Sequence, residues 1–373
     1  MRVAEIWKRC PLALRDSLPA WVLARLIVAA SLAGAKFIVD DFPQRAIGHR
    51  NDLSLIGWDG EFYELIARAG YAADADSYRF FPLYPLASKA LNFVTPGSTT
   101  VALVLLANVC SLGFVVLLHH LVQRETGDVD LARRAAWFGC IAPAAFVMVW
   151  GYAEPTFLLL AVATFLMLRT DRFAAAGLFG ALAALTRPLG VLIAISAAFE
   201  ASRGFRNADV RGRAERVVAV AGPPIGTLAY LLWTLDRTGD FLEPYRIQAL
   251  AVHRGKTVDP VTGIANALSE FFDHDRIGPL FHVGWAVVAV ALVVVTFRRL
   301  PASYGLFSAA TVIIALSSHN LDSFERYAFN AFPLIIVVAM IFHTRRQETL
   351  AFTAAGALML LYGTLAALSL YVP

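Results

Sequence analysis

The chain has 373 residues, of which 58% are hydrophobic and only 16% charged, and its mean hydropathy is +0.62. Soluble domains carry about a quarter charged residues, so this composition excludes a soluble globular protein and predicts a polytopic integral membrane protein. The isoelectric point is near 9.0, but the basic residues gather between apolar segments. Basic residues between apolar segments are typical of the loops of a protein surrounded by membrane lipids. They give no indication of nucleic acid as a partner.

The first apolar run is expected to be a permanent anchor, because Met1–Ala20 is too charged for a cleavable signal peptide. Of the three cysteines, Cys10 lies near the N-terminus, and Cys110 and Cys140 lie inside apolar runs. None lies in a polar loop or at a metal-ligand spacing, so we expect neither disulfides nor a metal site.

A membrane-spanning helix needs roughly 20 apolar residues. The segments that meet this requirement or come close to it are 19–38, 100–122, 132–150, 154–169, 215–235, 281–297, 303–318, 327–343 and 349–371. Residues 173–201 are also apolar but are interrupted at Arg187-Pro188, which predicts two short helices that meet at the outer side. The sequence therefore predicts an all-α protein of about eleven transmembrane helices, with residues 1–373 forming a single domain.

The distribution of charge predicts the orientation of these helices. With the N-terminus in the cytoplasm, most of the 32 basic residues fall on inner segments and most of the 28 acidic residues fall outside. The long loops 39–99 and 236–280 then lie on the outer face. We expect this to be the active face, and the richness in alanine, arginine and valine suggests a bacterial plasma membrane.

The most informative stretch is the polar and aromatic segment Leu55–Leu86. Residues Trp58, Phe62, Ile66 and Ala69 recur at helical spacing, which predicts a short amphipathic helix lying in the membrane interface. The following run, Phe80-Phe81-Pro82-Leu83-Tyr84-Pro85, is expected to be irregular, because its prolines disfavour a regular helix.

Several motifs, taken together, resemble the PIG-V-type mannosyltransferases of the GT-C glycosyltransferase superfamily. They are Trp58-Asp59-Gly60, Gly70-Tyr71, Phe80-Phe81-Pro82-Leu83-Tyr84-Pro85, Arg187-Pro188-Leu189-Gly190, Gly239-Asp240 with Gln248 and Arg254, and Glu325-Arg326-Tyr327 with Phe332-Pro333. The resemblance implies a GT-C-like fold. It also implies transfer of mannose, with inversion, from a polyprenyl-phosphate-mannose donor to a lipid-linked or glycan acceptor on the non-cytoplasmic face. No further cofactor is implied.

Inverting transfer needs a carboxylate that accepts the proton of the acceptor hydroxyl. Asp59 is the first candidate for this base, and the alternative is that it caps the helix beginning near Gly60. Asp40, Asp41 and Asp52 are rival carboxylates.

A lipid-phosphate leaving group needs cations, and guanidinium groups suit phosphate well. Arg187, Arg254 and Arg326 are the candidates. An ion pair with Glu154 is the alternative for Arg187, and Glu154 itself is also a candidate substrate-binding residue. For Arg254 and Arg326 the alternative is a snorkelling side chain at the interface.

Further candidate contacts to the substrates come from polar and aromatic side chains near these motifs. Gln248 and His253 precede Arg254, while Trp58, Phe81 and Tyr84 could stack on the sugar or guide the isoprenoid chain. The alternative for the aromatic residues is the aromatic belt of a membrane protein. Two other classes of function remain possible at this stage, a transporter or flippase of lipid-linked sugars and a non-catalytic scaffold subunit.

Overall fold

The computed structural model describes residues 11–41, 53–274 and 278–373. Within these ranges the chain forms helices and no strands, as the composition predicts. Cys10 and the rival carboxylate Asp52 lie outside the described residues.

Five of the helices are long and apolar enough to cross a membrane, which confirms the membrane-protein prediction. They are α2 (Leu12–Asp41), α5 (Thr99–Thr126), α10 (Val210–Thr238), α13 (Gly278–Arg299) and α17 (Arg345–Ala367). Shorter apolar helices lie between them: α7 (Glu154–Leu168), α8 (Phe173–Thr186), α14 (Ala302–Leu316), α16 (Phe332–Ile341), and the segment formed by η4 (Pro188–Leu192) and α9 (Ile193–Ser202). The number of eleven transmembrane helices stays a prediction.

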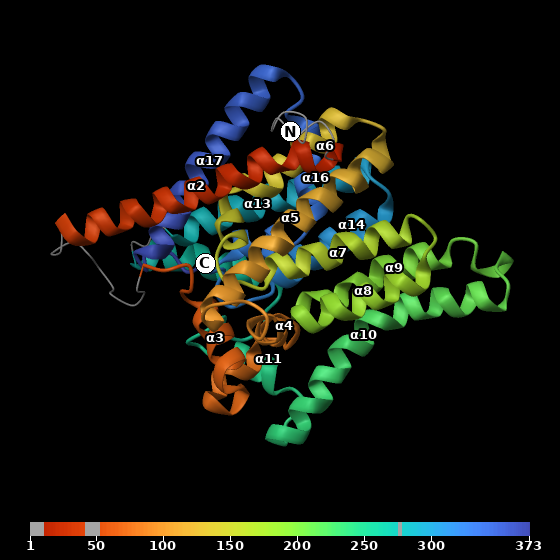
Figure 1. The fold of residues 1–373 in the computed structure, drawn as a ribbon, viewed down its shortest axis with the longest axis horizontal. Helices are drawn as coiled ribbons and strands as arrows, with labels where there is room; N and C mark the ends of the chain where they lie inside the picture. Colours follow the sequence, from red (N-terminus) through yellow and green to blue (C-terminus); the bar gives the residue numbers. More distant parts are fainter. Residues whose placement is uncertain (1–10, 42–52, 275–277) are drawn as a thin grey trace.

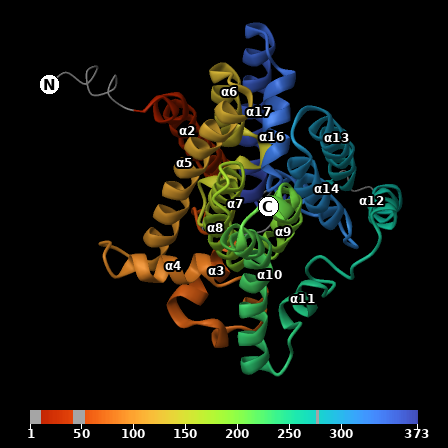
Figure 2. The ribbon, with the colours of Figure 1, turned by 90° about the vertical axis from the view of Figure 1, so that its right-hand side faces the viewer.

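The remaining elements connect or cover these helices. They are α3 (Asp59–Ala69), η1 (Tyr71–Ala73), η2 (Ala75–Arg79), α4 (Leu83–Asn92), α6 (Val129–Ile141), η3 (Pro143–Met148), η5 (Phe205–Asn207), α11 (Glu243–Gln248), α12 (Pro260–His274) and α15 (Phe324–Phe329). In both overall views α3, α4 and α11 lie in the lower half of the molecule, around the lower part of α10 (Figures 1 and 2).

Proline sets several boundaries that hydropathy alone leaves open. The predicted break at Arg187-Pro188 is confirmed, because α8 ends at Thr186 and η4 begins at Pro188. The predicted span 132–150 is wrong in its second half, where α6 ends at Ile141 and Pro143 starts a 3-10 segment. Proline lacks the backbone N–H that would continue the α-helical bonding.

The first loop is more helical than its prolines suggest. Pro85 lies in the first turn of α4, where backbone N–H groups have no intrahelical partner and proline is tolerated. The expectation of an irregular segment is therefore wrong from Leu83 onward. The predicted helix α3 is present, but its buried face contains Tyr63 and Ala67, whereas Ala69 is exposed.

Close packing of α8 on α10 fixes the position of the break that carries Arg187. A Cβ atom on Gly222 of α10 would lie only 2.1 Å from the carbonyl oxygen of Gly177 on α8. Only glycine allows this approach, so the two helices touch backbone to backbone. The end of α8, and the arginine that follows it, are thereby held against α10.

Candidate functional site

The site forms where the first loop meets the short helix α15. Arg326 on α15 donates a 2.6 Å hydrogen bond from Nη1 to Oδ2 of Asp59, the first residue of α3. The preceding residue, Trp58, has a φ of 55°, in the left-handed region that non-glycine residues seldom adopt. Such strain is typically held by surrounding contacts at functional positions, and here the Trp58 ring N–H donates to the carbonyl of Ala366.

The end of α3 bears on the alternative role of Asp59 as a helix cap. The N-terminal flanking residue of α3 is Trp58, and no side chain caps this helix end. The capping role is therefore wrong, because the Asp59 carboxylate is directed to Arg326 instead. Its role as the base is left as a prediction.

Glu154, at the start of α7, joins the two arginines that flank this pair. Its fully buried carboxylate forms ion pairs with Arg187 and, at 3.3 Å, with Arg326. The pairing of Arg187 with Glu154, left open by the sequence, is thus present. Because the Glu154–Arg326 contact continues to Asp59, four buried or nearly buried charges form one connected network.

A cavity of about 300 Å³ opens on one side of this network. Its charged lining residues are Asp59, Arg79, Arg187 and Arg254. Three guanidinium groups thus face one carboxylate. When Glu154 and Arg326 behind the wall are included, the site has four arginines and two carboxylates. Its net charge is therefore positive, so the cavity favours an anion.

Tyr327 forms the centre of the cationic side of the cavity. The guanidinium carbon of Arg254 lies 4.0 Å from the centre of its ring, and those of Arg326 and Arg187 lie at 5.4 and 5.8 Å. Arg254 also donates to the Ser318 hydroxyl at 3.1 Å and to the Ala315 carbonyl at 2.7 Å. Arg254 is therefore fixed in orientation by neutral partners.

The electrostatics of the site keep Asp59 ionised. Burial alone would raise the pKa of Asp59, but the charges of Arg326 and Arg79 outweigh burial and hold this pKa below its ordinary value. For Arg326, burial would lower the pKa, and the neighbouring Asp59 and Glu154 carboxylates raise it well above the ordinary value. Both partners carry their charge at neutral pH.

The structure brings only part of the predicted set to the cavity wall. Among the candidate residues, those that line the cavity are Asp59, Arg187, Arg254, Gln248 and Phe81. Arg326 and Glu154 lie behind the wall and act on it through their ion pairs.

Trp58, Tyr84 and His253 do not line the cavity, so their predicted contacts with substrate have no support here. The Tyr84 hydroxyl donates to the Leu103 carbonyl, and its ring is fully buried in the core. His253 Nε2 lies 3.2 Å from Oδ2 of Asp76. Burial and the Arg79 charge lower the pKa of His253 despite this carboxylate.

Sequence reasoning missed Arg79, Tyr63 and Tyr327, which line the cavity. Arg79 lies 4.0 Å from Asp59, and its guanidinium stacks over the ring of Phe80 at 4.4 Å. Its position directly before Phe80-Phe81-Pro82 was the available signal.

The rival carboxylates Asp40 and Asp41 are exposed at the end of α2 and do not line the cavity. Across the described part of the chain, no three histidine, cysteine or acidic side chains are grouped as metal ligands.

A family model described as Mannosyltransferase (PIG-V) matches residues 23–218, slightly more than half of the chain. No curated protein matches the chain.

Among solved structures, the chain is similar to ArnT from Cupriavidus metallidurans bound to undecaprenyl phosphate, with a TM-score of 0.50 and 15% identity over 88% of this chain and 62% of ArnT. It is also similar to the Archaeoglobus fulgidus oligosaccharyltransferase in the apo form, with a TM-score of 0.48 and 13% identity over 93% of this chain. The chain spans 56% of the length of that oligosaccharyltransferase. At 15% identity, the similarity to ArnT concerns the fold alone.

Proposed function

The chain belongs to the PIG-V mannosyltransferase family, and from this premise we propose that it moves mannose from a polyprenyl-phosphate-mannose donor to a lipid-linked or glycan acceptor. The transfer inverts the anomeric carbon and takes place on the outer face of a bacterial plasma membrane. Glycosyl transfer in a membrane is the activity that the family match supports. The donor, the stereochemistry and the face are the parts proposed here.

The observation that carries the proposal is the charge of the cavity wall, with Asp59 as its single carboxylate against Arg79, Arg187 and Arg254. A sugar phosphate donor needs cations around the phosphate, and an incoming hydroxyl needs a proton acceptor. The wall supplies both. The bound undecaprenyl phosphate in the ArnT structure is consistent with a lipid phosphate as the ligand of such a fold.

In this reaction the acceptor hydroxyl oxygen forms a bond to C1 of mannose while its proton passes to the Asp59 carboxylate. The bond between C1 and the phosphate oxygen breaks on the opposite face of the sugar, and the phosphate leaves with the electron pair. Arg79 and Arg254 stabilise the charge that develops on this oxygen. No metal ion is needed for the electron balance.

Arg254 is the most favourable phosphate ligand. Among the described residues it has no carboxylate within the 4.0 Å of an ion pair, whereas Arg187 pairs with Glu154 and Arg326 pairs with Asp59. A phosphate approaching Arg254 therefore does not have to displace an existing anion. Arg187 and Arg326 instead hold the acidic side chains in place.

The test uses purified protein with polyprenyl-phosphate-[14C]mannose and a bacterial membrane lipid extract. We expect label in a glycolipid, with an anomeric configuration opposite to that of the donor when the product is examined by NMR. A parallel reaction with a nucleotide-activated mannose should give no product. Transfer from the nucleotide sugar alone, or retention of configuration, would contradict the proposal.

A further inference from the structure

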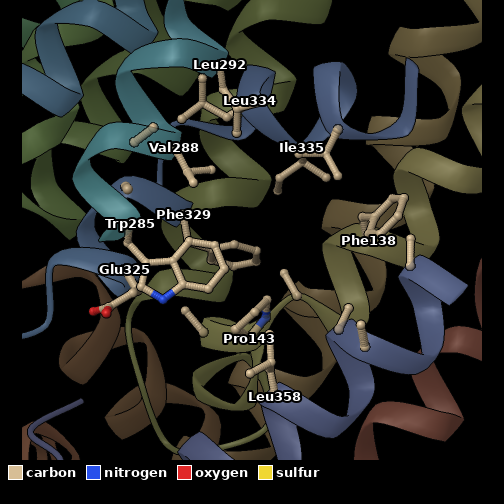
Figure 3. Close-up of a pocket in the computed structure, with 18 of the residues that line it drawn as sticks. Phe138, Pro143, Trp285, Val288, Leu292, Glu325, Phe329, Leu334, Ile335 and Leu358 are labelled. Carbon is tan, nitrogen blue, oxygen red and sulfur yellow. The ribbon is translucent and has the colours of Figure 1, made fainter. Parts of the chain in front are cut away.

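A second cavity of about 360 Å³ lies apart from the charged site and is almost entirely apolar. Figure 3 shows its labelled side chains surrounding an open space, with Glu325 at one edge. Its lining includes Phe138, Val288, Leu292, Ile335, Ala354 and Leu358. We refer to this space as the apolar groove.

The walls of the groove come from two of the long apolar helices. α13 supplies Val288 and Leu292, α17 supplies Ala354 and Leu358, and α16 and α6 form the floor. Both α13 and α17 are long and apolar enough to cross a membrane. The exposure of Val288 and Ala354 shows that the groove opens to the surroundings of these helices, which in a membrane are hydrocarbon chains.

One end of the groove is closed by hydrogen bonds. The Trp285 ring N–H on α13 donates to the Tyr362 hydroxyl on α17 at 2.9 Å. Tyr362 and Tyr371 in turn donate to the Glu325 carboxylate at 3.3 and 3.2 Å. A chain lying in the groove would therefore have its polar end at Glu325.

Two consecutive residues of α15, Glu325 and Arg326, face surroundings of opposite charge. Glu325 binds Nδ1 of His282 at 3.0 Å, and Asp322 lies 3.9 Å from the same ring, so two carboxylates surround a single histidine. The next residue, Arg326, faces the cationic cavity through its contact with Asp59. A phosphate favours the cavity, whereas the two carboxylates at the Glu325 end disfavour an anion and leave an uncharged head as the better fit there.

The donor chain has a different way out of the charged cavity. Ile314 on α14 lines that cavity and is half exposed, next to the apolar Pro188 and Leu189. A polyprenyl chain whose phosphate contacts Arg254 can leave past Ile314. The apolar groove is thus available to a second lipid.

We infer that the apolar groove binds the hydrocarbon chain of the acceptor, a glycolipid with an uncharged sugar head at the Glu325 end of the groove. This inference rests on the proposed function, because it assigns the second substrate of that reaction. The donor and acceptor chains then lie on different sides of α15, where Glu325 borders the groove and the adjacent Arg326 contacts Asp59.

The probe is a hexadecyl mannoside with a diazirine at the end of its chain, added to the full-length protein in phosphatidylcholine nanodiscs without donor. We expect photolabelling of α13 or α17 peptides, competed by unlabelled hexadecyl mannoside and not by methyl mannoside. Ala354→Phe fills the groove and should reduce labelling at least about fivefold, because each excluded methylene forfeits about 0.8 kcal/mol. Ala357→Phe is the matched control, since Ala357 is also exposed on α17 but does not line the groove.

Equal labelling of Ala354→Phe and Ala357→Phe would overturn the inference. Labelling of the same peptides by a diazirine phosphatidylcholine, to the same extent as by the mannoside probe, would also overturn it, because it would indicate a general lipid contact. Both variants should keep the thermal midpoint of the wild type, which separates occupancy from folding. Because labelling needs no donor, normal labelling without any mannosyl transfer would count against the proposed function alone. Normal transfer with labelling on other helices would count against the groove alone.

Discussion

Arg326 and Asp59, 267 positions apart in the chain, form a 2.6 Å ion pair that joins α15 to the first turn of α3. The Asp59 side chain is 19% exposed and faces the cavity, whereas that of Arg326 is 5% exposed and lies behind it. The arginine thus keeps the carboxylate ionised without occupying the space that a substrate would need. The proposed role of Asp59 as proton acceptor requires this access from the cavity, where Arg79 also lies 4.0 Å from its carboxylate.

Asp59→Asn should therefore abolish turnover and leave donor binding largely intact. Loss of a general base typically costs about 100-fold or more in rate, and the amide still accepts a hydrogen bond from Arg326. The measurement is single-turnover transfer from polyprenyl-phosphate-[14C]mannose, together with equilibrium binding of the donor. Asp76→Asn is the control, because Asp76 contacts His253 outside the cavity wall. A fully active Asp59→Asn variant would show that Asp59 is not the general base.

Most of the apolar helices and the break at Arg187 could be predicted from sequence because they depend on local properties, namely apolar length and the missing N–H of proline. The span 132–150 was wrong in its second half, where Pro143 starts a 3-10 segment. The pairing of Asp59 with Arg326 has no local signature, since it depends on how α3 and α15 pack. Arg79 was missed although it directly precedes the Phe80-Phe81-Pro82 motif. Trp58 was named among the aromatic residues that could stack on the sugar or guide the isoprenoid chain, but its ring N–H donates to the carbonyl of Ala366 and it does not line the cavity.

Arg254→Lys should weaken donor binding while the protein stays folded. A lysine keeps the charge but has a single ammonium in place of the planar guanidinium that now contacts Ser318, Ala315 and the Tyr327 ring. Charge-assisted hydrogen bonds contribute about 1.5–3 kcal/mol, which predicts a roughly 10- to 100-fold rise in the donor dissociation constant. Arg246→Lys, an exposed position outside the cavity, should leave it unchanged; equal affinity in both variants would exclude Arg254 as the phosphate ligand.

The pH dependence should distinguish Asp59 from His253 as the base. The pKa of Asp59 is held below its ordinary 3.8, and that of His253 is lowered from 6.5. With Asp59 as base, kcat/KM has no acid limb between about pH 5 and 7, and His253→Gln has the same profile. An acid limb below pH 6.5 that disappears in His253→Gln would assign the proton to the histidine.

The same depressed pKa has a consequence for stability. A carboxyl group whose pKa is lower in the folded state stabilises the fold fully above its unfolded pKa, here near 3.8. The contribution is lost as pH falls through the lower folded value. The thermal midpoint of Asp59→Asn should therefore approach that of the wild type as the pH is lowered below 3.8, and a constant difference would contradict the shift.

The outward orientation of the cavity can be tested by cysteine accessibility. Arg246 is exposed on α11, whose Gln248 lines the cavity, and Arg211 is exposed at the start of α10. A membrane-impermeant maleimide applied to intact cells should modify Arg246→Cys and leave Arg211→Cys unmodified until the cells are opened. The described native cysteines, Cys110 and Cys140, are buried and give a low background. The reverse labelling pattern would place the active face in the cytoplasm.

Glu154 and Arg187 should behave as a coupled pair in stability measurements. Removing one partner of a buried ion pair leaves an uncompensated charge and typically costs 3–5 kcal/mol. Glu154→Gln should be the more severe single change, because it deprives Arg326 as well as Arg187 of a carboxylate.

The double variant Glu154→Gln/Arg187→Gln should be less destabilised than the sum of the two single variants, by at least about 1 kcal/mol. The measurement is the thermal midpoint in detergent at one heating rate for all four proteins. Glu348→Gln is the control, since Glu348 pairs with Arg133 at a partly exposed position where a salt bridge contributes at most about 1 kcal/mol. Additive effects of the two substitutions would show that the two charges are compensated separately, and Arg187 would then be free to bind phosphate.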